Sequence, residues 1–373
     1  MFITLFYAVI GLYFLAVSFF LIGLFLEEKN HSSTQPFITV VLPAKNERDH
    51  IHRILREVVH QTYPKEKYEV IVVDDESTDI TPNVTHAFME KYDNVHFLST
   101  EGSASPLRNK KRPLDIGIRS ARGEIILLTD ADCHISSQWI ESMVSCFTPD
   151  TGLVIGHAEI DHPETAMQQI EALDFLLLMG AARGTASLGF PFACTGQNLA
   201  YRKEVFEQAG GFSSFADAAG GDDNLLLQNI KQHKEWTITT AFDRASYVST
   251  PPLPNLRPFI SQRIRWAADS LSVRQTDMFF FFVIIVTFLA NLLILLLAAS
   301  LLFSLKWFFP FILALGLKFI VEGLLMLRTT SLFERFDMRR SFPIWFFSQI
   351  PYVVVMGIVT LLPIPTGWGG RQK

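Results

Sequence analysis

The sequence predicts an α/β domain with a mainly parallel sheet, flanked at both ends of the chain by helices long enough to cross a membrane. Two observations lead to this fold class. Between residues 36 and 128, short apolar runs typical of strands alternate with segments of helical periodicity, the pattern of a parallel sheet covered by helices. The chain is also 49% hydrophobic with 33 Phe, and its apolar residues gather at its two ends.

The alternating part has strands and helices of ordinary length. One helix is expected where Ile51, Ile54, Leu55 and Val58 recur on a single face. Strands are expected at 36–42, 68–73, 95–98 and 124–128, and helices at 49–61, 79–91 and 113–121. This spacing forms βαβ units, and ligands of such sheets bind beyond the carboxyl ends of the strands.

Apolar stretches at 1–26, 278–303, 307–327 and 342–362 predict membrane-spanning helices. The first stretch lacks a positively charged start and a small-residue cleavage site, so we expect it to remain as an anchor. The predicted domains are the anchor at 1–26, a globular domain at 27–253, an interfacial helix at 254–277 and membrane or interfacial helices at 278–373.

Charge and cysteine usage indicate the compartment. Four Arg between residues 328 and 341 place that loop, and the globular domain with it, on the cytosolic side by the positive-inside rule. Three Cys without a C-x-x-C pair fit a reducing compartment. We therefore expect a multi-pass protein of the inner cell membrane with a cytosolic globular domain. A net charge of −5 gives no basic field, so nucleic acid is not an expected partner.

Two carboxylates, Asp130 and Asp132, follow the apolar run 125–128 and are expected to lie close together beyond the end of that strand. Residues i and i+2 of an extended segment point the same way, and this edge of an open sheet is where ligands bind. Oxygen ligands suit Mg²⁺ or Mn²⁺, which share carboxylates with the phosphates of a substrate. Taken alone, this fragment is equally consistent with two solvent-exposed Asp residues in a turn at the end of the strand.

Other polar residues lie at the second strand and before the third helix. Asp74 and Asp75 follow the run 68–73, where they fit either an Asx turn or acceptors for a nucleotide base or ribose. Lys110 and Lys111 precede the helix expected from Pro113, near a helix N-terminus that favours an anion. A short run of basic residues on the solvated surface would give the same sequence pattern.

Three further segments are candidates for substrate contact. Gly196 permits close approach of the backbone to a ligand. Asp222 and Asp223 open an apolar helical run, where they fit an N-cap or a general base that takes the proton of an acceptor hydroxyl. The segment Gln262-Arg-Ile-Arg-Trp266 fits an amphipathic helix lying on a membrane.

In their order, these motifs resemble those of glycosyltransferase family 2, in the membrane-embedded branch with cellulose, chitin and hyaluronan synthases and ceramide glucosyltransferases. The resemblance covers roughly residues 36–270, and its specificity lies in the ordered set rather than in any one motif. The matching segments are Val41-Leu-Pro-Ala-Lys-Asn-Glu47, Asp74-Asp-Glu-Ser-Thr-Asp79, Lys110, Thr129-Asp-Ala-Asp132, Gly196-Gln-Asn-Leu-Ala-Tyr-Arg202, Gly210-Gly-Phe212, Asp222-Asp223 and Gln262-x-x-Arg265-Trp266.

The resemblance implies a GT-A fold, Rossmann-like with a mainly parallel sheet, and a nucleotide-sugar donor, with UDP-sugar as the expected one. It implies that Asp130 and Asp132, a DxD motif, hold the donor through Mg²⁺ or Mn²⁺, and that Asp223 is the base, with Asp222 beside it. The residues it matches to substrate binding are Pro43, Glu47, Asp74, Asp75, Lys110, Gly196, Asn198, Gln262, Arg265 and Trp266. The chain departs from the family at Asp222, where Glu is usual, and at 267–269, where an Arg-Gly pair is common.

The expected activity is inverting transfer of one sugar to a membrane lipid at the cytosolic face. About four spans leave little room for the channel of a processive polysaccharide synthase, which is the alternative with a saccharide acceptor. A catalytically silent subunit that binds nucleotide-sugar is a third possibility, and a metal-dependent hydrolase a fourth. Lys318 and Glu322, at i and i+4 inside an apolar stretch, are expected to neutralise each other.

Overall fold

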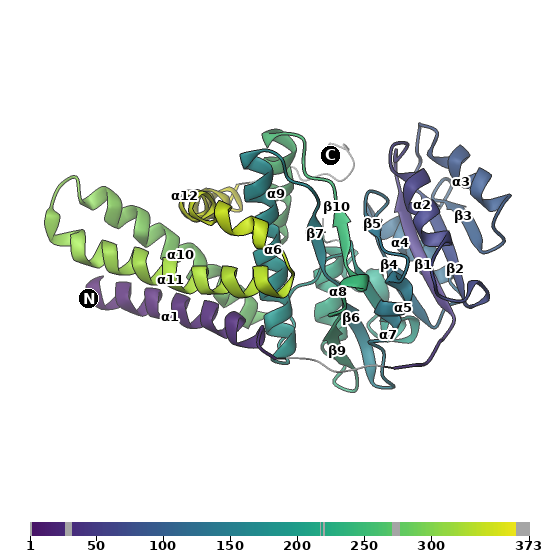
Figure 1. The fold of residues 1–373 in the computed structure, drawn as a ribbon, viewed down its shortest axis with the longest axis horizontal. Helices are drawn as coiled ribbons and strands as arrows, with labels where there is room; N and C mark the ends of the chain where they lie inside the picture. The colour runs from purple at the N-terminus through teal and green to yellow at the C-terminus, as the bar shows by residue number, and fades with distance from the viewer. Residues whose placement is uncertain (1, 27–31, 217, 219–220, 271–276, 363–373) are drawn as a thin grey trace. The chain divides into compact units, whose positions relative to one another are not determined.

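The computed structural model describes residues 2–26, 32–216, 218, 221–270 and 277–362 (Figure 1). The chain divides into two compact units. A helical unit comprises Met1–Glu27, His162–Phe190 and Pro252–Thr366, and an α/β unit comprises Glu28–Asp161, Pro191–Pro251 and Gly367–Lys373. The predicted interval 27–253 therefore contributes to both units. Residues 271–276 and 363–373, where the predicted interfacial helix and the C-terminal segment end, lie outside the described part.

The α/β unit is built on a sheet of seven strands among its described residues, in the order β3-β2-β1-β4-β8-β6-β9. The strand bounds are Ile38–Ala44 (β1), Tyr68–Asp74 (β2), Val95–Ser99 (β3), Ile125–Leu128 (β4), Thr151–Ile155 (β6), Leu199–Arg202 (β8) and Thr237–Thr240 (β9). The pairs β2-β3, β1-β2, β1-β4 and β6-β9 are parallel, whereas β8 is antiparallel to both β4 and β6. The predicted α/β class with a mainly parallel sheet is confirmed.

Helices follow the strands as the periodicity predicts. In α2, Ile51, Ile54, Leu55 and Val58 are buried, because their spacing places them on one face of the helix. The helices of this unit are α2 (Ile51–Val59), α3 (Thr81–Met89), α4 (Lys111–Ser120), α5 (Trp139–Val144), α7 (Lys203–Gln208) and α8 (Asp222–Ile230). A smaller sheet orders β5 (His134–Ile135), β10 (Val248–Thr250) and β7 (Ala158–Ile160).

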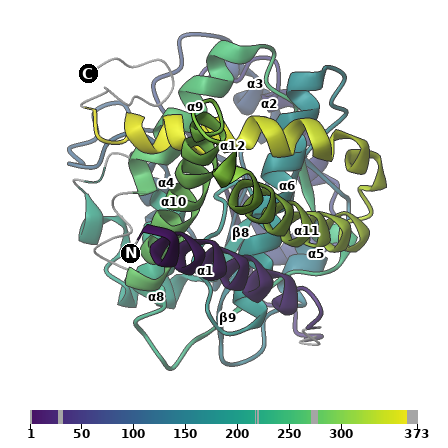
Figure 2. The ribbon, with the colours of Figure 1, turned by 90° about the vertical axis from the view of Figure 1, so that its left-hand side faces the viewer.

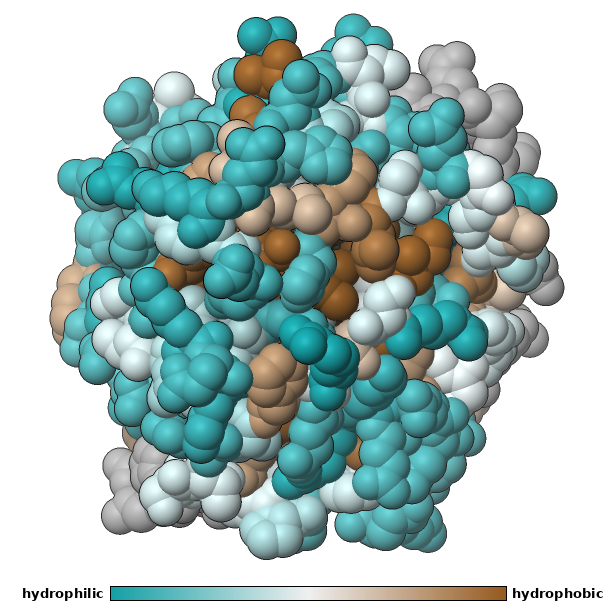
Figure 3. All heavy atoms as spheres, turned by 90° about the vertical axis from the view of Figure 1, so that its right-hand side faces the viewer, coloured by the Kyte–Doolittle hydropathy of each residue, from teal (hydrophilic) through white to brown (hydrophobic). Residues whose placement is uncertain are grey.

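The strand register brings the ends of β1, β2 and β4 to one edge of the large sheet. Ala44 pairs with Asp74 across β1 and β2, and Val41 pairs with Leu128 across β1 and β4. Because β8 runs antiparallel to β4, its first residue, Leu199, lies at this same edge. The loops after β1, β2 and β4 and the loop before β8 therefore converge. Seen from the side of α3 and β3, the surface of the unit is mainly hydrophilic, with apolar residues near its middle (Figure 3).

The helical unit contains α1 (Phe2–Gly23), α6 (Ala166–Ser187), α9 (Leu256–Ser270), α10 (Met278–Ser300), α11 (Phe308–Leu332) and α12 (Phe342–Val359). Among the residues described, four stretches are long and apolar enough to cross a membrane: Thr4–Gly23, Met278–Ser300, Leu305–Leu332 and Phe336–Val359. Helix α1 lies alongside α10 and α11 (Figures 1 and 2). These helices agree with the predicted spans.

Helix α6 packs against α1 at a close backbone crossing. A Cβ added to Gly23 would collide with the backbone of Gly184, and one added to Gly184 would collide with the carbonyl oxygen of Phe20. Glycine at both positions lets the two helices approach more closely than any larger residue allows. The crossing therefore explains why α6, which lies inside the predicted globular interval, belongs to the helical unit.

Candidate active site

The converging loops of the α/β unit carry the polar residues singled out in the sequence. Pro43 is buried in β1 and pairs with Val73. Asp74 ends β2, and its Oδ2 accepts a hydrogen bond at 3.0 Å from the backbone N–H of Ser77, three residues further along, which stabilises the turn after the strand. Pro43 and Asp74 thus shape the ends of two adjacent strands.

Asp75 lies in the interior just beyond β2 and is held by basic groups. Its Oδ1 accepts hydrogen bonds from Arg112 Nη2 at 2.6 Å and from Thr100 Oγ1 at 2.9 Å, while Lys45 Nζ lies 3.6 Å from Oδ2. Burial alone raises the pKa of Asp75, but the hydrogen bonds from Arg112 and Thr100 and the charges of Arg112 and Lys45 outweigh it and lower the pKa. Asp75 therefore stays ionised and holds the side chains of Arg112 and Thr100 in place. The sequence did not single out Arg112, Thr100 or Lys45 as its partners.

Asp130 and Asp132 follow β4, and Lys110 donates from Nζ to Asp130 Oδ1. Burial and then the charge of Asp130 raise the pKa of Asp132. Burial, followed by the charges of Asp132 and Asp130, raises the pKa of Glu47 to about 7. Glu47 therefore lies within electrostatic reach of this pair, and the burial and mutual repulsion of these acids favour a positive charge beside them.

The carboxylate pair fits a divalent cation. Both acids offer hard oxygen atoms, and excess negative charge is what a bound Mg²⁺ or Mn²⁺ would neutralise. Over the described residues, no group of three or more His, Cys, Asp or Glu is arranged to hold a metal. Asp130 and Asp132 would thus hold the ion together with oxygen atoms from a substrate or water.

Asp223 lies in the first turn of α8 and faces the loop before β8. Its Oδ2 accepts a hydrogen bond from the Gly196 N–H at 2.7 Å, and its Oδ1 accepts one from the Asn224 N–H at 2.8 Å. Burial raises the pKa of Asp223, and these hydrogen bonds and the charge of Lys110 offset it only in part. The carboxylate is therefore held in place and more basic than an ordinary Asp. Asp222 precedes it at the start of the same helix.

Gly196 joins the acidic pair to Asp223. A Cβ on Gly196 would lie 3.5 Å from Lys110 Nζ and 3.6 Å from Asp223 Oδ2, in ordinary contact with both. Since Lys110 is also bonded to Asp130, the ammonium lies between the pair after β4 and the carboxylate of α8. The structure thus brings Asp130, Lys110, Gly196 and Asp223 to one place.

Asn198 supports this edge from inside the fold. Its Nδ2 donates to the carbonyl oxygens of His157 at 2.8 Å and Ser246 at 2.7 Å, and its Oδ1 accepts from Trp139 Nε1 at 3.0 Å. The side chain is fully buried. In this structure Asn198 joins the residue before β7, helix α5 and the segment before β10, rather than presenting its amide to a ligand.

Lys111, the neighbour of Lys110, anchors the loop before α8, a role that its sequence position did not reveal. Its Nζ is fully buried and donates to the carbonyl oxygens of Phe215 at 3.0 Å, Ala216 at 3.0 Å and Ala218 at 2.5 Å. The basic pair was visible in the sequence, but the partners of Lys111 lie more than a hundred positions away. Lys111 thus holds the segment that leads to Asp223.

Gln262, Arg265 and Trp266 lie on α9 of the helical unit, and all three are half-buried. The ring of Trp266 packs against Phe175 of α6, with ring centroids 6.0 Å apart. The predicted helical conformation of this segment is confirmed.

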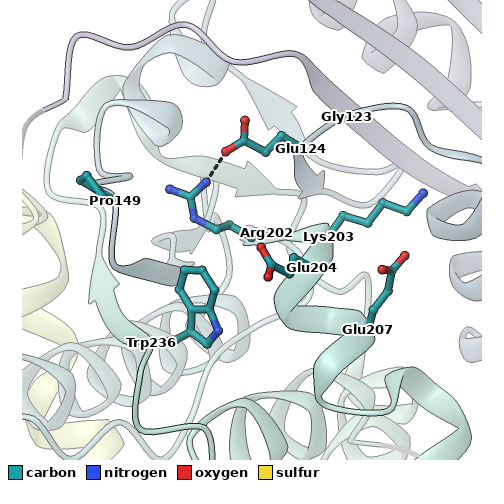
Figure 4. Close-up of a pocket in the computed structure, with 8 residues that line it drawn as sticks. All are labelled: Gly123, Glu124, Pro149, Arg202, Lys203, Glu204, Glu207 and Trp236. Carbon is teal, nitrogen blue, oxygen red and sulfur yellow. Dashed lines mark hydrogen bonds and ion pairs between the residues drawn. The ribbon is translucent and has the colours of Figure 1, made fainter.

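A separate pocket of about 570 Å³ opens at the opposite edge of the large sheet, where β4 begins and β8 ends (Figure 4). Arg202 pairs there with Glu124 and lies over the ring of Trp236. Lys203 Nζ donates to the carbonyl oxygen of Ala121 at 2.7 Å, and Trp236 Nε1 donates to Gln208 Oε1 at 2.8 Å. These polar groups stabilise the fold locally, and none of the predicted site residues lines the pocket.

Comparison with known proteins relates this α/β fold to glycosyltransferases. Glycosyl transferase family 21 matches residues 1–352, so the chain belongs to this family. The sequence motifs resembled glycosyltransferase family 2 and its ceramide glucosyltransferase branch, whereas the family that matches is family 21. The predicted class of enzyme, a glycosyltransferase, is confirmed.

Individual relatives cover part of the chain. Glycosyltransferase AglE of Haloferax volcanii is 32% identical over 195 residues, which are 51% of this chain and 60% of that protein. The beta-monoglucosyldiacylglycerol synthase of Trichormus variabilis is 30% identical over 242 residues, which are 64% of this chain and 50% of that protein. The chain thus spans about half to three fifths of the length of these relatives.

A solved structure shares the fold over most of the chain. It is the mannosyltransferase PcManGT from Pyrobaculum calidifontis, in complex with GDP-Man and Mn²⁺. The likeness has a TM-score of 0.56 and 18% sequence identity, and it covers 95% of this chain and 93% of that one. At this identity, the comparison shows a common GT-A fold.

Proposed function

We propose that this protein transfers a single sugar from a nucleotide-sugar, with a UDP-sugar as the expected donor, to a membrane lipid, with inversion at the anomeric carbon. The observation that carries the proposal is the placement of Lys110 between Asp130 and Asp223 around Gly196. A site for an anionic donor and a positioned base are thereby adjacent. We place the reaction at the cytosolic face of the inner cell membrane, with the apolar helices as multi-pass spans.

In the proposed reaction, Asp223 takes the proton of the acceptor hydroxyl as that oxygen attacks the anomeric carbon. The bond between this carbon and the diphosphate breaks, and the nucleoside diphosphate leaves with the electron pair. The raised pKa of Asp223 favours proton uptake, and its bonds to Gly196 and Asn224 fix its orientation. When bound at Asp130 and Asp132, Mg²⁺ or Mn²⁺ would supply positive charge for the departing diphosphate.

The remaining roles follow from contacts and from the family. Lys110 adds positive charge beside the donor, and the segment of Pro43 and Glu47 borders the nucleotide. Gln262, Arg265 and Trp266 are proposed to contact the acceptor or the diphosphate. A lipid acceptor is supported by the apolar helices and by the relative named for glucosyldiacylglycerol synthesis, which is 30% identical to this chain.

The base assignment is tested with Asp223→Asn, because an Asn side chain can still accept the hydrogen bond from Gly196. We expect transfer to fall by about 10²–10⁴-fold, while binding of the UDP-sugar with Mn²⁺ persists. Asp130→Asn is the matched variant for the donor site, and it should weaken metal-dependent donor binding instead. Normal turnover of Asp223→Asn would refute the proposed base.

The acceptor is tested by incubating membranes with a panel of radiolabelled UDP-sugars and separating the products. Label in a lipid-soluble product supports the proposed transfer. Label in a polymer would indicate a polysaccharide synthase, and free labelled sugar without an acceptor would indicate a hydrolase. No product with any sugar would indicate a catalytically silent subunit.

A further inference from the structure

Arg263, which the sequence motifs pass over, is the most deeply buried cation of α9. Its side chain is 2% exposed. Nη1 lies 2.9 Å from Asp174 Oδ2 on α6, and the other oxygen of Asp174 accepts a hydrogen bond from Trp345 Nε1 on α12 at 3.0 Å. One carboxylate therefore ties α9 to α6 and α12, and it fixes the guanidinium from one side.

On the other side of the guanidinium, two donors have no hydrogen-bond partner within the described part of the chain. Arg263 Nε and Nη2 are both buried, and neither has a hydrogen-bond partner among the described residues. These two N–H groups form one edge of the planar guanidinium, with parallel bonds suited to a pair of oxygen atoms. Buried donors without partners are rare, because an N–H group taken out of water without a new acceptor loses its hydration uncompensated. Such an edge is therefore a candidate for oxygen atoms supplied from outside the protein.

Aromatic rings lie over the guanidinium of Arg263. The guanidinium carbon lies 4.4 Å from the ring centroid of Trp266 and 5.0 Å from that of Phe259, and the Phe259 ring lies 6.5 Å from that of Tyr352. Phe259, Arg263 and Trp266 follow the i, i+4 and i+3 spacing that places them on one face of α9. Trp266 and Tyr352 are half-buried, so this aromatic cluster is partly accessible from outside the fold. Planar donors beside aromatic faces suit a ligand with both oxygen atoms and apolar surface.

The charged groups around Arg263 favour a neutral ligand. Asp174 already neutralises Arg263, and Glu171, 1% exposed on the same helix as Asp174, adds a carboxylate that accepts from the Leu253 N–H at 3.1 Å. An incoming phosphate would meet a cluster with two acids and one base, which is unfavourable in a buried setting. A neutral headgroup, in contrast, accepts from Arg263 without adding charge.

We infer that the Nε–Nη2 edge of Arg263 binds the oxygen atoms of a neutral, hydroxyl-bearing lipid headgroup, with Trp266 and Phe259 as the walls of the site. The inference rests on the proposed function for its choice of a lipid, and it adds the headgroup class and a residue outside the matched motif. Binding is measured without a donor, so that its outcome is independent of sugar transfer.

The experiment titrates the full chain in neutral detergent micelles with 1,2-dioctanoylglycerol or with dioctanoyl phosphatidic acid, and follows tryptophan fluorescence. We expect saturable binding of the diacylglycerol and none of the phosphatidic acid over the same range. The Trp266→Phe variant shows whether Trp266 is the source of the fluorescence change. In Arg263→Lys, which keeps the charge opposite Asp174 but loses the planar edge, the affinity should fall about tenfold. Arg257→Lys, an exposed position on the same helix, is the matched control and should bind as the wild type does.

Wild-type affinity of Arg263→Lys, an equal loss in Arg257→Lys, or equal binding of phosphatidic acid would each overturn the inference. If Arg263→Lys fails to fold, a photoreactive dioctanoylglycerol must label α9 in the wild type, and labelling confined to other segments would overturn it as well. A chain that binds diacylglycerol through Arg263 but transfers no sugar refutes the proposed function alone. If Arg263→Lys transfers sugar to a lipid as the wild type does and also binds the diacylglycerol with wild-type affinity, this inference alone is refuted.

Discussion

Replacing Lys111 by Met is expected to destabilise the α/β unit and to disturb the loop before α8. Met keeps the length and apolar character of the Lys stem, so the packing around it is preserved. What is lost is the ammonium, which donates to the carbonyl oxygens of Phe215, Ala216 and Ala218 at 3.0, 3.0 and 2.5 Å. Three buried carbonyl groups would then lose a charged donor at once.

The size of the effect follows from the number of bonds and from their burial. A hydrogen bond to a charged group contributes about 1.5–3 kcal/mol, but these three share one ammonium whose own burial costs several kcal/mol. Three buried carbonyl groups left without a donor would cost about 1–3 kcal/mol each, and losing the buried ammonium offsets part of that cost, so we expect a net loss of about 3–5 kcal/mol. For a domain of this size, each kcal/mol lowers Tm by about 2–4 °C, so we expect a decrease of about 6–20 °C.

Thermal unfolding of the purified chain in detergent measures this change, with Lys234→Met as the control at an exposed position. The control should unfold like the wild type, because exposed substitutions alter stability by about 0.5 kcal/mol or less. Turnover of Lys111→Met should fall more than its donor affinity, since the loop leads to Asp223. Wild-type melting together with wild-type turnover would refute the anchoring role of Lys111.

Three further outcomes are expected. Gly184→Ala should cost about 1–3 kcal/mol in thermal unfolding, because its Cβ meets the backbone of α1, whereas Gly316→Ala, with open space around it, should not. Lys318→Met should destabilise the helical unit by leaving Glu322 without the ammonium 2.5 Å away, and adding Glu322→Leu should recover part of that loss in the same assay. Asp75 has a lowered pKa, so its stabilisation is complete above the unfolded pKa of about 3.9 and is lost as the pH falls through the lower folded value. The difference in unfolding midpoint between wild type and Asp75→Asn should therefore shrink below about pH 4; a constant difference would contradict the assigned ionisation.

Local periodicity predicted the elements that bury one regular face. Helix α2 is found where the apolar spacing places it, and β1, β2, β3 and β4 are found within a few residues of their expected bounds. The sequence did not predict that β8 enters the sheet antiparallel, because strand direction depends on pairing with β4 and not on local pattern. It also did not predict the place of α6, whose contact with α1 depends on Gly23 and Gly184, two glycines far apart in the chain.

Residue type and order predicted the acids of the site, because Asp130 and Asp132 follow an apolar strand and Asp223 begins a helix. Their partners were not predictable in the same way. The contact of Asp223 with Gly196 and the full hydrogen bonding of Asn198 both join segments that only the folded sheet brings together. A motif thus identifies which residue types are present, while the tertiary fold decides whether each side chain faces a ligand or its own interior.

The adjacent lysines at the start of α4 show how one short segment serves both purposes. Successive residues of a helix point about 100° apart, so Lys110 and Lys111 cannot face the same way. Lys110 reaches Asp130 at the carboxyl edge of the sheet, and Lys111 reaches the carbonyl groups of the loop before Asp223. Because both side chains leave the same turn of backbone, a shift of this turn would move the charge beside Asp130 and the anchor of the base together. The start of α4 therefore couples the proposed donor site to the proposed base through geometry alone.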